Sequence, residues 1–222
     1  MSAEKELWAA VDAYINETLV PVDDALDAAL KASDAAGLPQ ISVTPNQGKF
    51  LHLLARIRGA RNILEVGTLG AYSTIWLARA LPRDGKLITI EADPKHADVA
   101  LANIARAGFA DRVELRRGLA LDILPTIAAD SKGPFDLVFI DADKANIPAY
   151  FEWAMKLTTK GSVIIVDNVV RDGAVIDAGS DDPSVLGVRR LNEMLAQDKR
   201  VSATTIQTVG SKGYDGFTIA LR

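Results

Sequence analysis

Apolar residues recur every three or four positions over residues 4–36 and again after Pro45. This spacing places them on one face of an α-helix. Pro45 suits the first position of a helix, and Thr44 before it is a candidate cap. The sequence therefore predicts helices across residues 1–60, and the stripe of the first helix consists of Leu7, Val11, Ile15 and Leu19.

From Arg61 the pattern changes to short β-branched runs that alternate with amphipathic stretches. Strands this apolar are buried on both faces, which is typical of a parallel sheet covered by helices. The alternation predicts a doubly wound, Rossmann-like α/β sheet. The predicted strands are Asn62–Val66, Lys86–Glu91, Val113–Arg117, Leu137–Ile140 and Ser162–Val166, and the predicted helices cover 72–81, 94–108, 119–129 and 145–158.

The last part of the chain adds a predicted helix, Val185–Gln197, and two strand-like runs, Val201–Thr208 and Phe217–Leu221. Because only a turn over residues 210–216 separates these runs, we expect them to pair antiparallel at one edge of the sheet. The sequence thus predicts a single domain over residues 1–222, with an N-terminal helical cap (1–60) on an α/β core (61–222).

Composition narrows the functional classes. The chain has 222 residues, no cysteine, and a formal net charge of −4. The lack of cysteine excludes disulfides, thiolate metal ligands and thiol nucleophiles. A mildly acidic protein without a basic stripe is a poor nucleic-acid binder. No apolar run approaches the ~18 residues of a membrane span, and no signal segment is evident. We expect a cytoplasmic protein with a small-molecule partner.

The turn after the first strand carries two glycines, Gly67 and Gly70. Glycine lets the backbone pass close to a ligand, but Gly-x-x-Gly is not the Gly-x-Gly-x-x-Gly of a dinucleotide site. An acidic residue about 20 positions further on, Glu91, is placed to accept hydrogen bonds from a ribose. By itself the Gly-x-x-Gly spacing is equally consistent with a tight strand-to-helix turn that binds no ligand. Asp93, two residues after Glu91, is consistent with a helix cap.

Oxygen-bearing side chains follow the fourth and fifth strands, namely Asp141, Asp167 and Asn168. Both strand ends face one crevice in a parallel sheet. Carboxylate and amide oxygens suit Mg²⁺, Mn²⁺ or Ca²⁺, and three such ligands leave about three octahedral positions open. Lys144 is close enough to act as a general base on a metal-bound hydroxyl. Taken alone, Asp141 or Asp167 is better explained as a helix cap, and Lys144 as a solvated side chain. Taken together, these residues predict a metal site.

These residues support a family resemblance. The run Glu65–Ser73, with Glu91, Gly118-x-Ala120 and Asp141-Ala142-Asp143-Lys144, resembles the class I methyltransferases. More narrowly it is similar to the cation-dependent O-methyltransferases of the catechol and caffeoyl-CoA type. The resemblance implies the sheet order 3-2-1-4-5-7-6 with strand 7 antiparallel, a homodimer, and a catechol-like acceptor methylated from S-adenosylmethionine. The cofactor residues that it implies are Thr44, Glu65, Gly67, Thr68, Ser73, Glu91, Ala92, Gly118, Ala120, Asp141 and Tyr150.

Two positions depart from the family pattern: Ala71 stands where a glycine is common, and Ile147 where an aromatic is frequent. Three other functions stay open. The acidic net charge argues against a tRNA-modifying methyltransferase. The missing third glycine argues against an NAD-dependent oxidoreductase. Retention of the metal-ligand set with Lys144 argues against a non-catalytic scaffold. The loop 171–182 and the turn 211–215 are the expected acceptor contacts, with Arg171 or Lys212 available to meet a carboxylate or phosphates.

Overall fold

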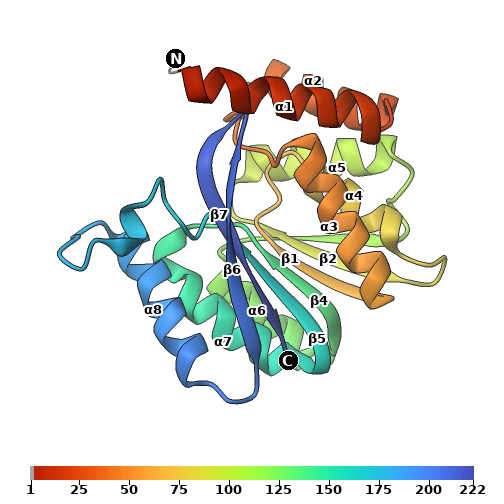
Figure 1. Ribbon diagram of the computed structural model, residues 1–222. Helices are drawn as coiled ribbons and strands as arrows, with labels where there is room; N and C mark the ends of the chain where they lie inside the picture. Colours follow the sequence, from red (N-terminus) through yellow and green to blue (C-terminus); the bar gives the residue numbers. More distant parts are fainter. Residues whose placement is uncertain (1–2) are drawn as a thin grey trace.

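A mixed seven-stranded sheet forms the centre of the molecule in the computed structural model, which describes residues 3–222 (Figure 1). The strand order is β3-β2-β1-β4-β5-β7-β6, as predicted, and β7 is antiparallel to both of its neighbours. Met1 and Ser2, which the predicted cap includes, lie outside the described residues. The strands are β1 (Asn62–Val66), β2 (Lys86–Glu91), β3 (Val113–Arg117), β4 (Phe135–Ile140), β5 (Thr158–Asp167), β6 (Ser202–Gly210) and β7 (Gly213–Leu221).

Helices cover both faces of this sheet, which explains why its central strands are apolar throughout. One core cluster packs α2 to α5 against one face, and a second packs α6, α7 and α8 against the other. The helices are α1 (Ala3–Leu19), α2 (Asp24–Ala35), α3 (Pro45–Arg58), α4 (Tyr72–Ala80), α5 (Pro94–Arg106), α6 (Ala120–Ala129), α7 (Ile147–Leu157) and α8 (Pro183–Gln197), with 3₁₀ turns η1 (Lys144–Asn146) and η2 (Ala174–Ile176).

The N-terminal helices lie across the end of the sheet where the β6–β7 hairpin turns (Figure 1). Asp23 caps α2 by accepting hydrogen bonds from the amides of Ala25 and Leu26, and it also pairs with Arg79 of α4. This ion pair and the buried apolar face of α2 fix the segment to the sheet. The predicted cap by Asp93 is present on α5. Thr44 precedes α3 as expected, but its hydroxyl bonds Asn46 Oδ1 and caps no backbone amide.

Four strands extend beyond their predicted limits, namely β4, β5, β6 and β7. β4 begins at Phe135 and β5 at Thr158, because these two residues pair with each other before a bulge. The predicted turn 210–216 is mostly strand, since β6 and β7 pair as far as Gly210 and Gly213 and leave only Ser211 and Lys212 in the turn. Glycine and aspartate suggested a loop there, but ladder hydrogen bonds come from the backbone and do not require apolar side chains.

Among residues 3–222, no helix combines the length and the apolar character needed to cross a membrane.

Candidate active site

The register of the sheet brings the predicted site residues to one edge. Ile90, Val66, Ile140 and Val166, the final or near-final residues of four adjacent strands, are paired in one row. The amide of Asp141 then donates to the carbonyl of Val66 at 2.9 Å, which continues the ladder one residue past β4. The loops that follow β1, β4 and β5 therefore start level with one another.

Gly67 lies directly against the loop that carries Asp141. A Cβ at this glycine would stand 2.1 Å from the carbonyl oxygen of Asp141, and its φ of 96° is one that other residues rarely adopt. Only glycine fits both demands. The glycine turn after β1 thus allows the two loops to touch, in addition to any role toward a ligand.

The Asp167 carboxylate is held at both oxygens. Its Oδ1 accepts from the amide of Asn168 at 2.8 Å, and its Oδ2 accepts from Gln47 Nε2 at 2.7 Å. Burial, and then the nearby charge of Asp141, raises the pKa of Asp167 above its usual range. A second carboxylate so close to a buried one is unfavourable without a cation. The cation nearest Asp141 is Lys144, whose Nζ lies 2.7 Å from Asp141 Oδ1.

The donor set fits a hard divalent cation. Asp141, Asp167 and Asn168 offer carboxylate and amide oxygens at two adjacent strand ends, and Asn168 adopts a left-handed φ of 57° that turns the chain away from β5. Over residues 3–222 no three His, Asp or Glu side chains gather as a metal cluster. A metal here therefore depends on the Asn168 amide as its third protein ligand, which is ordinary for Mg²⁺ or Ca²⁺.

The Glu91 carboxylate organises the glycine turn. It accepts hydrogen bonds from the amides of Thr68 (3.2 Å), Leu69 (2.7 Å) and Asp93 (2.9 Å). His96 Nδ1 lies 3.7 Å from the same carboxylate. The predicted ribose contact is untested, but these bonds place Glu91 directly beneath the β1 loop, at the end of β2.

Glu65 is fully buried at the end of β1 and accepts hydrogen bonds from three hydroxyls, those of Ser73, Thr74 and Thr89. Burial raises the pKa of Glu65 to about 7, against the effect of these hydrogen bonds. Ser73 lies in the first turn of α4, so the carboxylate ties the start of that helix to β1 and β2.

The remaining predicted cofactor residues surround the same loops. Gly118 has a φ of 138° and its amide donates to the carbonyl of Glu91, while Ala120 is buried at the start of α6 and Ala92 is exposed. Tyr150 is buried and its hydroxyl donates to Asp143. Burial and the Asp143 charge raise the pKa of Tyr150. Asp143 therefore orients Tyr150.

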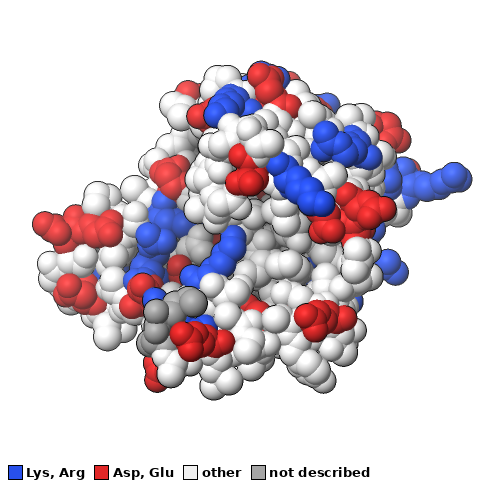
Figure 2. Space-filling view, turned by 90° about the horizontal axis from the view of Figure 1, so that it is seen from above, with Lys and Arg blue, Asp and Glu red and all other residues white. Residues whose placement is uncertain are grey.

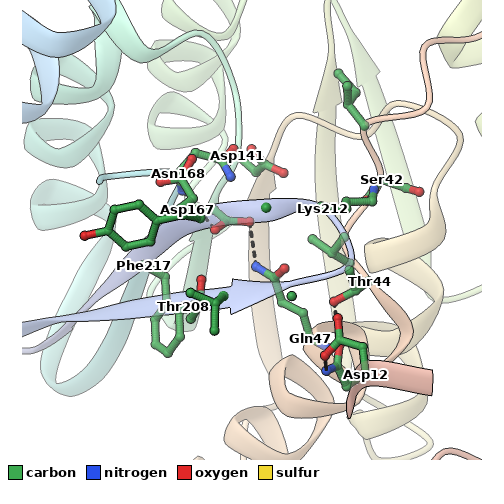
Figure 3. Close-up of a pocket in the computed structure, with 18 of the residues that line it drawn as sticks. Asp12, Ser42, Thr44, Gln47, Asp141, Asp167, Asn168, Thr208, Lys212 and Phe217 are labelled. Carbon is green, nitrogen blue, oxygen red and sulfur yellow. Dashed lines mark hydrogen bonds between the residues drawn. The ribbon is translucent and has the colours of Figure 1, made fainter. Parts of the chain in front are cut away.

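A cavity of about 530 Å³ opens beside the carboxylates (Figure 3). Of the residues predicted to bind the metal or the cofactor or to catalyse the reaction, Thr44, Asp141, Asp167 and Asn168 line it, and the others, Lys144 included, do not. Phe50 and Phe217 form part of its wall, with ring centroids 5.1 Å apart. Seen from above, Lys and Arg side chains gather beside a hollow in this face (Figure 2). The cavity's charged wall includes Arg171 and Lys212, the two predicted anion contacts.

Sequence reasoning missed Gln47 and Asp12, both of which line this cavity. The available signal for Gln47 was two amides, Asn46 and Gln47, in the first turn of a helix, followed by Gly48. A Cβ at Gly48 would stand 2.3 Å from the Trp76 ring, so this glycine lets α3 pack closely on α4 and sets the direction of Gln47. Asp12 carries no such signal in the sequence.

Comparison with known proteins identifies the class of protein. The O-methyltransferase family model matches residues 17–222, and the chain belongs to this family. It is 53% identical to a catechol O-methyltransferase of Niastella koreensis, covering 97% of this chain and 98% of that protein, and 56% identical to one of Mycobacterium tuberculosis, covering 95% and 94%. These matches confirm the resemblance noted in the sequence.

Solved structures agree. An O-methyltransferase of Bacillus cereus in complex with SAH is 59% identical, with a TM-score of 0.97 and coverage of 98% of this chain and 99% of that one. The O-methyltransferase TomG of Streptomyces achromogenes, involved in tomaymycin synthesis and solved with SAM, is 55% identical, with a TM-score of 0.96 and 99% coverage of both. The protein is an S-adenosylmethionine-dependent O-methyltransferase.

Proposed function

We propose that this enzyme methylates one of two adjacent hydroxyls of a catechol-like small molecule, with a divalent metal held by Asp141, Asp167 and Asn168. One observation carries the proposal: three oxygen donors from adjacent strand ends converge at a cavity, with Lys144 paired to the first of them. The relatives named as catechol O-methyltransferases support the acceptor class.

A bound metal would lower the pKa of a coordinated hydroxyl, as it does for bound water. The chain's own contribution is the placement of Lys144. Its Nζ lies beside Asp141, with 10% of the side chain exposed, so it is shielded from bulk water yet adjacent to a proposed ligand. We assign Lys144 as the general base: once its ammonium group has released a proton to solvent, Nζ takes the hydroxyl proton as the oxygen–carbon bond forms and the sulfur–carbon bond of the cofactor breaks.

The cofactor site that we propose lies at the ends of β1, β2 and β3. Glu65 and Glu91 hold the β1 loop from below, and Gly67 presses it against Asp141, so a methyl donor bound there lies next to the metal ligands. The ring of the acceptor fits between this edge and the aromatic wall of Phe50 and Phe217. Such positioning is the main source of rate in a methyl transfer of this kind.

We further propose a homodimer. The outward face of α1 exposes Leu7, Val11 and Tyr14, with 62%, 48% and 68% of each residue accessible. Beside it, β6 is exposed along nearly its full length and is an edge strand of the sheet. Exposed apolar stripes and open edges mark interaction surfaces. Val11→Asp should then shift the species observed by analytical ultracentrifugation from dimer to monomer; a monomeric wild type would contradict this part.

The decisive experiment is a panel of acceptors scored for methyl transfer. Catechol should be methylated and 1,3-dihydroxybenzene should not. EDTA in excess over the metal should abolish turnover until excess Mg²⁺ is added. Equal turnover of both isomers, or full activity in chelator, would contradict the metal-bound catechol. A tRNA methylated faster than any phenol would favour the alternative acceptor class.

A further inference from the structure

The helix α1 buries a carboxylate. Over its described residues, Ala3–Leu19, the one buried side chain is Asp12, with 6% exposed. A surface helix normally buries apolar residues, and a buried carboxylate is costly unless it is hydrogen-bonded. Asp12 meets that requirement with two partners from distant parts of the chain: its Oδ1 accepts from Asn46 Nδ2 at 2.9 Å, and its Oδ2 accepts from the amide of Ser211 at 2.7 Å.

These bonds continue to the proposed metal site. Asn46 Oδ1 accepts from the amide of Gln47 at 2.9 Å, and Gln47 Nε2 donates to Asp167 Oδ2 at 2.7 Å. Figure 3 shows Asp12 beside the start of α3, and Gln47 reaching from α3 to Asp167. Hydrogen bonds thus link the turn of the β6–β7 hairpin through α1 to the backbone of Gln47 on α3, and the side chain of Gln47 carries the link on to the end of β5.

We propose that Asp12, Asn46 and Gln47 form a positioning relay that sets the orientation of the Asp167 carboxylate for a divalent cation. The proposal rests on the proposed function, because it concerns the same metal. Gln47 is its terminal positioning residue and Asp12 its anchor on α1.

The geometry explains how the relay works. Asp167 lines the cavity but is only 4% exposed, so little of the residue is open to water. One oxygen accepts from the adjacent backbone amide of Asn168, and the other accepts from Gln47 Nε2. Without Gln47, the Asp167 carboxylate keeps the hydrogen bond at Oδ1 and loses the one at Oδ2. The carboxylate is then free to rotate about its Cβ–Cγ bond. Outer partners of this type are worth 10–100-fold in metal affinity.

The anchor is equally constrained. A Cβ at Gly210 would stand 2.5 Å from Asp12 Oδ2, so the hairpin backbone packs directly on the carboxylate. Asp12 therefore fixes α1, the first turn of α3 and the hairpin as one unit. All three of these elements line the cavity. This is why the loss of a side chain on α1 should be felt at Asp167, although the two residues do not touch.

The test measures Mn²⁺ binding directly, by electron paramagnetic resonance of free Mn²⁺ in titrations of the whole enzyme, alongside thermal unfolding. Gln47→Leu should weaken Mn²⁺ binding by about 10–100-fold. Asp12→Asn, a mild variant that keeps the shape of the side chain, should weaken it in the same direction. The double variant should lose less than the product of the two separate losses, because both act through one relay. Asp23→Asn is the matched control: it weakens another link between the N-terminal helices and the core, the partly buried Asp23–Arg79 ion pair, and it should lower Tm without changing Mn²⁺ affinity.

The outcomes are separable. A wild-type enzyme that binds no Mn²⁺ would sink the proposed function itself. A wild type that binds Mn²⁺, with Gln47→Leu binding it equally well, would overturn the relay and leave the proposed function intact. If Asp12→Asn lowers Tm but leaves Mn²⁺ affinity unchanged, Asp12 is only structural and the relay is wrong. S-adenosylmethionine affinity should be the same in all variants.

Discussion

Lys144 Nζ lies 2.7 Å from Asp141 Oδ1, three residues earlier in the chain. The pair bridges the end of β4 and the 3₁₀ turn that follows, so the lysine stays with the strand end and does not extend into solvent. Beneath it, the helix α8 supports the turn: a Cβ at Gly187 would stand 2.1 Å from the carbonyl oxygen of Lys144. The position of the ammonium group is therefore set from both sides.

Lys144→Ala should lower kcat by about 10²–10⁴-fold, the usual contribution of a general base. Cofactor affinity, measured by calorimetry with S-adenosylmethionine, should be unchanged. Since the pair also neutralises Asp141, a small change in KM for Mg²⁺ is expected as well. An unchanged kcat would remove Lys144 as the base.

Gly187→Ala should lower kcat because the new methyl group must push the Lys144 backbone away from its place. We expect a loss of about tenfold or more in kcat together with a decrease in Tm, since an over-packed contact costs about 1–3 kcal/mol. Gly179→Ala is the matched control, because its added Cβ meets only Asp177 Oδ1 at 3.5 Å. If both variants behave alike, the α8 contact does not position the lysine.

Glu65 should make stability depend on pH. Its pKa is raised from 4.5 to about 7 by burial, so the folded state keeps a proton that the unfolded state releases between these values. The free energy of unfolding therefore falls as pH rises from about 4.5 to about 7, by about 3 kcal/mol in total from this group. Glu65→Gln should remove this component. Urea unfolding at pH 5 and pH 8 measures it as the difference between the two proteins; parallel pH profiles would contradict the prediction.

Lys212 should favour acceptors that carry a carboxylate. It lines the cavity from the hairpin turn and donates to the carbonyl of Ser42. Burial lowers the pKa of Lys212, while the charges of Asp141 and Asp167 raise it. Lys212→Gln should reduce kcat/KM for 3,4-dihydroxybenzoate by about tenfold, equal to about 1.4 kcal/mol, and leave catechol nearly unchanged. Lys160→Gln, an exposed lysine outside the cavity lining, should affect neither acceptor. An equal loss for both acceptors would show that Lys212 only shapes the cavity.

The sequence was sufficient to predict the sheet because each strand is a local signal: a short apolar run followed by a turn. Once the strand order was inferred, the proximity of Asp141 to Asp167 followed from the parallel register. The length of the β6–β7 hairpin did not follow, since its pairing uses backbone groups beneath polar and glycine residues.

Gln47 and Asp12 were missed for another reason. Their importance comes from contacts across 120 and 199 residues of chain, to Asp167 and to Ser211. On α1 an aspartate is indistinguishable by pattern from the solvated acids around it. Burial of this one side chain depends on where the hairpin folds back, which no local spacing encodes. The cofactor contacts, the domain limits and the cellular location stay predictions.

Apart from Asp141, which follows β4, the walls of the cavity come from two stretches of chain, one before β1 and one that starts at Asp167, the last residue of β5. The loops proposed to hold the methyl donor lie between these stretches, over residues 65–150. The proposed acceptor site and the proposed methyl-donor site, Thr44 apart, are thus encoded in separable parts of the gene. An exchange of both terminal stretches with those of a relative should transfer its choice of acceptor as a unit, whereas an exchange of only one would divide the relay between Asp12 and Ser211.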